Sequence, residues 1–157
     1  MGIEIERRFL VETDAWRSAF AAGRGRARAI RQIYLASDES RTVRVRIADG
    51  TAATLTIKLG GAGLARGGFE YEIPLADAEE LAKGALGQPI DKTRHDIPLG
   101  RHVVELDVYA GALAPLVVAE IELSAETEAV DLPPWLGREI TGDPAYSNAR
   151  LALAGRP

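Results

Sequence analysis

Short stretches in which apolar and charged residues alternate recur along the whole chain. In the first ten residues, Glu4, Glu6 and Arg8 occupy alternate positions, and apolar residues take most of the others. Because successive side chains of a β-strand point to opposite faces, such a stretch has one charged and one apolar face. On one strand alone, the pattern is typical of a charged face in water. Its recurrence predicts about eight strands, at residues 1–11, 30–35, 42–47, 53–59, 69–73, 90–97, 103–109 and 116–123.

Turn and cap signals between these stretches predict how the strands are joined. Asp49-Gly50 is a hairpin signal between two alternating stretches. Cap residues and glycines predict short helices at residues 15–22, from Asp77 to Gly84 or Gly87, and from Pro144 to Ala154. Most connections are short, so we expect largely antiparallel strands. We find no domain boundary, and residues 1–157 are interpreted as a single domain.

The charged faces of the predicted strands carry both signs. The acids are Glu4, Glu6, Glu70, Glu72, Glu105, Asp107, Glu120 and Glu122, and the bases are Arg8, Arg44, Arg46, Lys58, Lys92 and Arg94. An open sheet with a wet, salt-bridged face is one explanation. However, the apolar faces need covering and the predicted helices are few and short. We therefore expect an α+β, mainly β fold: a closed eight-stranded antiparallel β-barrel, or tunnel, with a polar, charged lumen and a few outer helices.

Such a lumen has a chemical meaning. Carboxylates gathered from several strands suit a hard divalent cation, Mg²⁺ or Mn²⁺, which takes oxygen ligands. Arginines and lysines on other strands suit phosphate oxygens. A metal together with many cationic side chains implies a polyanion such as a triphosphate. The pattern therefore indicates phosphoryl chemistry, in which the protein mainly positions groups and neutralises charge.

Glu4-Ile-Glu-Arg-Arg8 is similar to the N-terminal Glu-x-Glu-x-Lys motif of a known family, the CYTH superfamily of triphosphate tunnel metalloenzymes. The resemblance is closest to its compact bacterial members, which hydrolyse inorganic triphosphate. It extends along nearly the whole chain, through residues 32–35, 44–46, 56–58, 70–73, 92–94, 105–107, 120–122 and 146–148.

The resemblance implies a set of site residues. Metal ligands would be Glu4, Glu6, Glu120 and Glu122, with Asp107 or Glu105. Phosphate contacts would come from Arg8, Arg44, Arg46, Lys58, Lys92 and Arg94. Tyr34 would orient a catalytic water beside Lys92, or else serve as an ordinary barrel residue. Two departures are Arg8, which stands at the motif's lysine and cannot lose a proton, and Ile33, which stands at a usual glycine.

The predicted function is metal-dependent hydrolysis of inorganic triphosphate to pyrophosphate and phosphate. One alternative is another triphosphate chemistry on the same scaffold, namely adenylate cyclase or a thiamine or nucleoside triphosphatase. The other is a non-catalytic polyphosphate-binding module. No inward aromatic platform or amide for reading adenine or thiamine stands out in the sequence, which favours the small substrate.

Composition limits the partners. The net charge of −4 argues against a basic surface for nucleic acid. No run of about 18 apolar residues is present, so we expect no membrane span. The chain contains no cysteine, which excludes disulfides and zinc–thiolate sites. No signal peptide is visible, so we expect a cytoplasmic protein, and a homodimer is left open.

Overall fold

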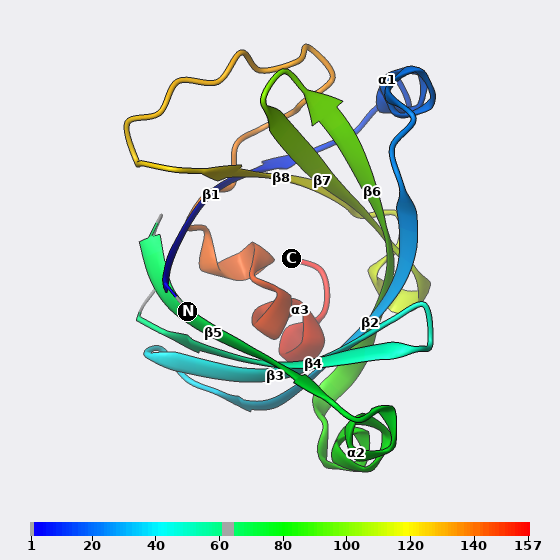
Figure 1. Ribbon diagram of the computed structural model, residues 1–157, viewed down its shortest axis with the longest axis vertical. Coiled ribbons are helices and arrows are strands. Elements are labelled where there is room, and N and C mark those ends of the chain that lie inside the picture. The colour runs from blue at the N-terminus through cyan, green and yellow to red at the C-terminus, as the bar shows by residue number, and fades with distance from the viewer. Residues whose placement is uncertain (1, 61–64) are drawn as a thin grey trace.

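The computed structural model describes residues 2–60 and 65–157, and eight β-strands dominate it (Figure 1). Every strand is antiparallel to the strands beside it, in the order β1-β5-β4-β3-β2-β6-β7-β8. The mainly β, antiparallel fold is thus confirmed. The strands are β1 (Gly2–Leu10), β2 (Ala27–Ser37), β3 (Arg41–Ala48), β4 (Ala52–Leu59), β5 (Ala65–Ile73), β6 (Leu86–Leu99), β7 (His102–Tyr109) and β8 (Val117–Leu123).

The sheet curls until β1 meets both β8 and β5, but the second of these seams is short. The pairing of β1 with β8 runs from Ile5 to Leu10, whereas that with β5 runs only from Gly2 to Ile5. Beyond Ile5, residues 137–140 cover this side of β1 instead of a strand. The Gly137 N–H donates to the Leu10 carbonyl at 2.7 Å, and the Ile140 N–H to the Arg8 carbonyl at 2.8 Å. The eight strands therefore form one ring, in which strand pairing between β1 and β5 covers only part of β1.

Two of the three α-helices, α1 (Trp16–Gly23) and α2 (Leu75–Leu81), lie outside the ring of strands (Figure 1). Trp16 of α1 packs on the outer apolar face of β6, β7 and β8, and Ala78 of α2 packs on that of β3 and β4. Short 3-10 turns occupy Ala82–Gly84, Gly111–Leu113 and Pro144–Tyr146. In the part of the chain that the structure describes, no helix is long and apolar enough to cross a membrane.

The third helix, α3 (Asn148–Ala154), corrects the expectation of outer helices only. Figure 1 shows α3 inside the outline of the ring. Its buried residues Ala149, Leu151 and Ala152 pack in one cluster with apolar side chains of the strands. On β1, β6, β7 and β8 these side chains share a strand face with the charged residues. They are Leu10, Ile90, Tyr109 and Val118. The inward faces are therefore charged over part of their length and apolar where α3 covers them.

Local capping chemistry moves two helix boundaries. The helix predicted from Pro144 is divided, because Ser147 has an extended backbone (ψ 145°) and its hydroxyl caps α3 by accepting the Arg150 N–H at 3.1 Å. Asp143 caps the preceding 3-10 turn by accepting the Ala145 N–H at 3.0 Å. The second helix begins at Leu75, so Asp77 lies in its first turn and forms no capping hydrogen bond there.

Candidate active site

The inward faces of the strands surround a cavity of about 690 Å³. Residues 144 and 147–149, beside and at the start of α3, form part of its lining. Of the predicted site residues, eleven line it: Glu4, Glu6, Arg8, Tyr34, Arg44, Arg46, Lys58, Arg94, Glu105, Glu120 and Glu122. Lys92 and Asp107 are not among the lining residues, although they belong to the same inward faces. The structure therefore separates a cavity surface from a second polar layer that lies behind it.

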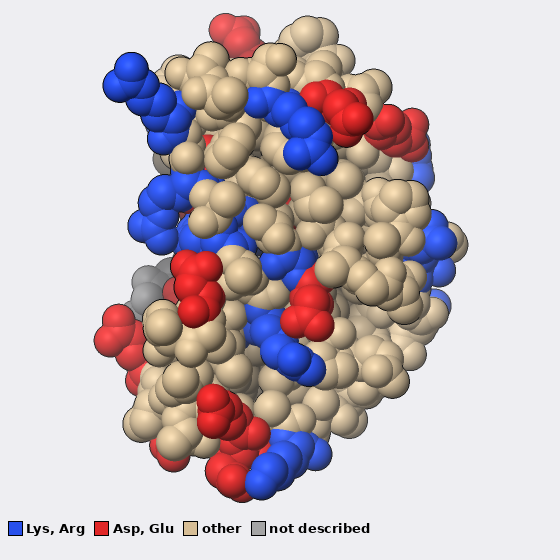
Figure 2. Space-filling model, turned by 90° about the vertical axis from the view of Figure 1, so that its right-hand side faces the viewer, with Lys and Arg blue, Asp and Glu red and all other residues tan. Residues whose placement is uncertain are grey.

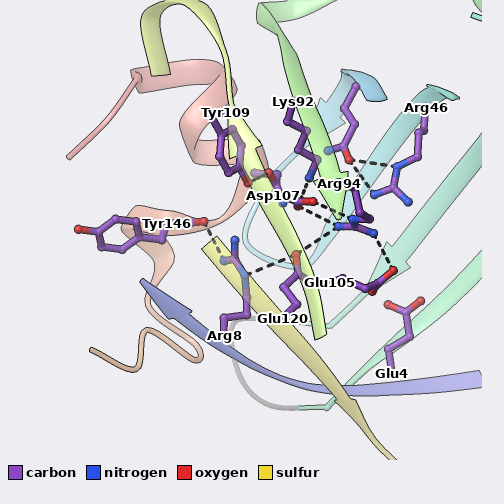
Figure 3. A network of polar contacts seen from close by, with 12 residues as sticks. Glu4, Arg8, Arg46, Lys92, Arg94, Glu105, Asp107, Tyr109, Glu120 and Tyr146 are labelled. Atoms are coloured by element: carbon purple, nitrogen blue, oxygen red, sulfur yellow. Dashed lines mark hydrogen bonds and ion pairs between the residues drawn. The ribbon is translucent and has the colours of Figure 1, made fainter. Parts of the chain in front are cut away.

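The second layer is a buried ion-pair network (Figure 3). Asp107 accepts two hydrogen bonds from the Arg94 guanidinium, at 2.8 and 2.9 Å, and its Oδ2 lies 2.7 Å from Nζ of Lys92. The side chains of Lys92 and Asp107 are both 0% exposed. Burial, aided by Arg94 and Arg46, lowers the pKa of Lys92 to about 7, although Asp107 opposes this shift. Burial also acts to raise the pKa of Asp107, but Lys92 and Arg94 outweigh it and lower that pKa.

Carboxyl groups of β1 and β8 form the acidic wall of the cavity. The charge of Glu120, together with burial, raises the pKa of Glu6 to about 8. Burial acts to raise the pKa of Glu120 as well, but its hydrogen bond with Glu6 and the charges of Arg8 and Arg94 hold that pKa well below its ordinary value. At neutral pH, Glu6 and Glu120 therefore share a proton, as closely spaced carboxyl groups do.

The remaining acids of the cavity differ in their ion-pair partners. Glu4 is paired with Nζ of Lys58 at 2.8 Å, and one oxygen of Glu105 lies 3.2 Å from Arg94. Glu122 lies opposite Glu6 in the register of β1 and β8. Within residues 2–60 and 65–157, no three acidic or histidine side chains are already gathered as a ligand set for a metal ion.

Arginines of β3 form the basic wall, which faces β1 and β8 across the ring. Arg44 donates to the Thr56 hydroxyl at 3.3 Å, and Arg46 donates twice to Oε1 of Gln32. Among the described residues, neither arginine has a carboxylate within 4.0 Å. Burial, with the charges of Arg44 and Arg94, lowers the pKa of Arg46 to about 10, so it stays positively charged at neutral pH.

Arg8 lies on β1, beside Glu120 of the acidic wall. Its Nη1 donates to the Tyr146 carbonyl at 2.8 Å, and its Nε lies 3.9 Å from Oε1 of Glu120. Its buried Nε and Nη2 atoms find no hydrogen-bond acceptor in the part of the structure that is described, and the same holds for Nε of Arg44. Because buried polar groups are nearly always paired, these unused donors indicate a place for an external acceptor.

The arrangement of charges inside the ring differs from that on the outer face shown in Figure 2. Figure 2 shows that, on the face turned to the viewer, acidic and basic side chains lie interspersed among uncharged ones. Inside, the uncompensated positive charge belongs to β3 and the proton-sharing carboxyl pair to β1 and β8. A ligand that carries a chain of negative oxygens together with a small cation would complement both walls.

Sequence reasoning missed two features that shape this site. Gln32, which is completely buried and holds Arg46, was noted only as part of a motif. Gln32 lies two residues before Tyr34, and this spacing along a strand is the signal that places both side chains on the inward face. The Tyr146 carbonyl, which accepts from Arg8, had no sequence signal, because backbone acceptors are not visible in side-chain patterns.

Comparisons with known proteins agree with this architecture. The family model described as "CYTH domain" matches residues 2–150. An inorganic triphosphatase of Acetivibrio thermocellus is 38% identical over 152 residues, covering 96% of this chain and 94% of its own. One of Nitrosomonas europaea is 39% identical over 156 residues, covering 96% of this chain and 97% of its own.

Solved structures give the same result. A crystal structure of an inorganic triphosphatase aligns with a TM-score of 0.69 and 34% identity, over 100% of this chain and 99% of that one. The family resemblance inferred from the motifs is therefore confirmed by both sequence and structure, and the chain belongs to the CYTH domain family.

Proposed function

We propose that this protein hydrolyses inorganic triphosphate to pyrophosphate and phosphate with the help of Mg²⁺ or Mn²⁺. The observation that carries the proposal is the pair of opposed walls of one cavity: arginines that have no carboxylate partner among the described residues face the carboxyl groups of β1 and β8. Relatives that cover almost the whole chain are named inorganic triphosphatases, which supports the same substrate.

The basic wall would bind the phosphate chain. Arg44 and Arg46 of β3 and Lys58 of β4 would contact phosphoryl oxygens from one side, with Arg8 and Arg94 on the other strands completing the ring. The unused donors of Arg8 and Arg44 are available without breaking any hydrogen bond already made. A linear triphosphate would use contacts on several strands at once, which pyrophosphate is too short to do.

The acidic wall fits a divalent cation. The charge of Glu120 and burial both favour the protonated form of Glu6, and a hard cation with oxygen preference would replace that proton. Glu4 and Glu122, on the same two strands, would be further ligands, with Glu105 at the cavity edge. Asp107 fits least well, because Lys92 and Arg94 already engage both of its oxygens. When bound, such a cation would neutralise charge on the phosphate being transferred.

The chain's own residues would position the water and the substrate. Tyr34 lines the cavity beside Arg44, its cross-strand partner, and would orient the attacking water. The water oxygen bonds to the terminal phosphorus, the bond to the bridging oxygen breaks, and the two protons of the water end on the two products. Lys92 does not reach the cavity surface, so we assign it to holding Asp107 and, through Asp107, Arg94.

The test is phosphate release from inorganic triphosphate, pyrophosphate, ATP and thiamine triphosphate, each with Mg²⁺ and with Mn²⁺. We expect the highest kcat/KM for inorganic triphosphate. Losing one charge-assisted hydrogen bond costs about 1.5–3 kcal/mol, so Arg44→Ala and Arg46→Ala should each lower this value about ten- to a hundredfold. Arg31→Ala is the matched control, because Arg31 is exposed and does not line the cavity.

Other outcomes would reassign the function. Comparable efficiency with ATP would indicate a nucleoside triphosphatase, and cyclic AMP as product would indicate a cyclase. Tight binding of triphosphate without release of phosphate under any condition would indicate a binding module.

A further inference from the structure

Gln32 is a fully buried side chain that contacts a cavity arginine. It lies on β2 directly opposite Arg46 of β3, and its side chain is 0% exposed. Its Oε1 accepts hydrogen bonds from both Nε and Nη2 of Arg46, at 3.1 and 2.7 Å. A single neutral oxygen therefore fixes one edge of this guanidinium, and the cationic group as a whole remains part of the cavity lining.

Arg94 provides a comparison within the same protein, because its guanidinium donates through the same two nitrogens as that of Arg46. Its Nε and Nη2 donate to Asp107 at 2.8 and 2.9 Å, and Figure 3 shows both arginines with these bonds. The difference is the charge of the acceptor: Asp107 is an ionised carboxylate, which compensates the charge of Arg94, whereas the amide of Gln32 is neutral. The fold thus orients these two arginines alike, but of the two, Arg46 is the one whose charge has no anionic partner among the described residues.

The amide carries a cost that a carboxylate would avoid. Nε2 of Gln32 is buried and finds no acceptor among the residues that the structure describes. An unsatisfied buried donor is destabilising, and a glutamate of nearly the same shape would have no such donor and would gain an ion pair with Arg46. A glutamate here would thus remove an unpaired donor and add an ion pair with Arg46, against the cost of burying a carboxylate.

We propose that Gln32 is a positioning residue that holds Arg46 ready for a phosphoryl group of the substrate without neutralising it. This inference rests on the proposed function, since it assumes a phosphate chain in the cavity. A guanidinium that is already oriented loses less conformational freedom when it binds an anion. A carboxylate at the same place would orient it equally well but would compete with the anion for its charge.

The experiment compares Gln32→Glu and Gln32→Leu with Gln88→Glu, an exposed position on β6 that controls for the change in net charge. Binding of inorganic triphosphate is measured by calorimetry without metal, and turnover is measured separately. For Gln32→Glu we expect affinity to fall and KM to rise about ten- to a hundredfold, with kcat changed much less. Its melting temperature should stay close to that of the wild type, because the new ion pair offsets the burial of a carboxylate, and a merely structural role would not predict this. Gln32→Leu keeps the charge and loses the orientation, so its loss of affinity should be smaller.

Three results would overturn the inference. The first is wild-type affinity in Gln32→Glu, and the second is an equal loss in the Gln88→Glu control. The third is a full additional loss when Gln32→Glu is placed in an Arg46→Ala background, since Gln32 is inferred to act through Arg46. Failure of the proposed function gives a different pattern: the wild type binds triphosphate with Gln32-dependent affinity but releases no phosphate. Absence of both binding and turnover would overturn both.

Discussion

Replacing Asp107 by asparagine should destabilise the protein strongly, even though the two side chains have the same shape. Asp107 is 0% exposed and is contacted at 2.7 to 2.9 Å by Lys92 and Arg94. The substitution leaves two buried cations without their shared anion. Lys92 can respond by losing its proton, because its pKa is already about 7, but Arg94 cannot.

The size of the effect follows from this arrangement. Removing one member of a buried ion pair costs about 3–5 kcal/mol. For a chain of this length, 1 kcal/mol corresponds to about 2–4 °C in melting temperature, so Asp107→Asn should melt about 6–20 °C below the wild type. Lys92→Met should cost much less, because Asp107 keeps both hydrogen bonds from Arg94.

Thermal unfolding followed by circular dichroism, at pH 7 without metal or phosphate, measures this difference. Asp91→Asn is the control, because this exposed acid lies 4.0 Å from Arg31 and should change stability by less than about 1 kcal/mol. Equal melting temperatures for Asp107→Asn and the wild type would refute the reasoning. If Asp107 is instead mainly a metal ligand, its replacement would weaken metal binding in calorimetry and leave the metal-free protein as stable as before.

Three further outcomes are expected. Chelation of divalent metal should abolish phosphate release, and full activity after verified metal removal would contradict this. Glu122→Gln should weaken metal binding in calorimetry and sharply reduce turnover, while its circular dichroism spectrum stays unchanged. Arg8→Lys should keep a substantial part of the activity, and Arg8→Ala should lose most of it. Normal turnover of Arg8→Ala would show that Arg8 only lines the cavity and makes no important phosphate contact. Hydrogen bonds from Ser124 and His102 lower the pKa of Glu128 from 4.5 to about 2. Its ionised form therefore stabilises the fold above about pH 5, and this contribution is lost as the pH falls toward 2. Glu128→Gln should accordingly lower the melting temperature at pH 7 and not at pH 2, and an equal loss at both would contradict it.

Strand alternation predicted which side chains point inward but not how deep each would lie. Lys58 and Lys92 are equivalent in the sequence pattern, yet Lys58 lines the cavity and Lys92 is fully buried behind it. The difference depends on neighbours from other strands, such as Asp107, which a pattern within one strand does not contain. Eleven of the thirteen predicted site residues therefore line the cavity, and the other two form its support.

The position of α3 escaped prediction for a related reason. Leu10, Tyr109 and Val118 continue the charged faces of their strands as apolar residues, and this end of the ring is where α3 packs. A seven-residue helix with small apolar residues carries too little periodicity to show which surface it will cover. Strand alternation also could not show that β1 would pair with β5 over only part of its length, since register depends on both partners.

Pairing between β1 and β8 determines when, during synthesis, the chain can first become active. Arg8 pairs with Glu120 across that seam, and residues 137–140 complete the other side of β1, so β1 is fully paired only once residues 117–140 are present. Contacts this distant in sequence form late in folding. A chain released before residue 117 would carry Arg44, Arg46 and Lys58 without the carboxyl groups of β8. Such a fragment would attract phosphate anions and lack half of the proposed metal site, so hydrolysis would begin only after residues 117–140 have been synthesised.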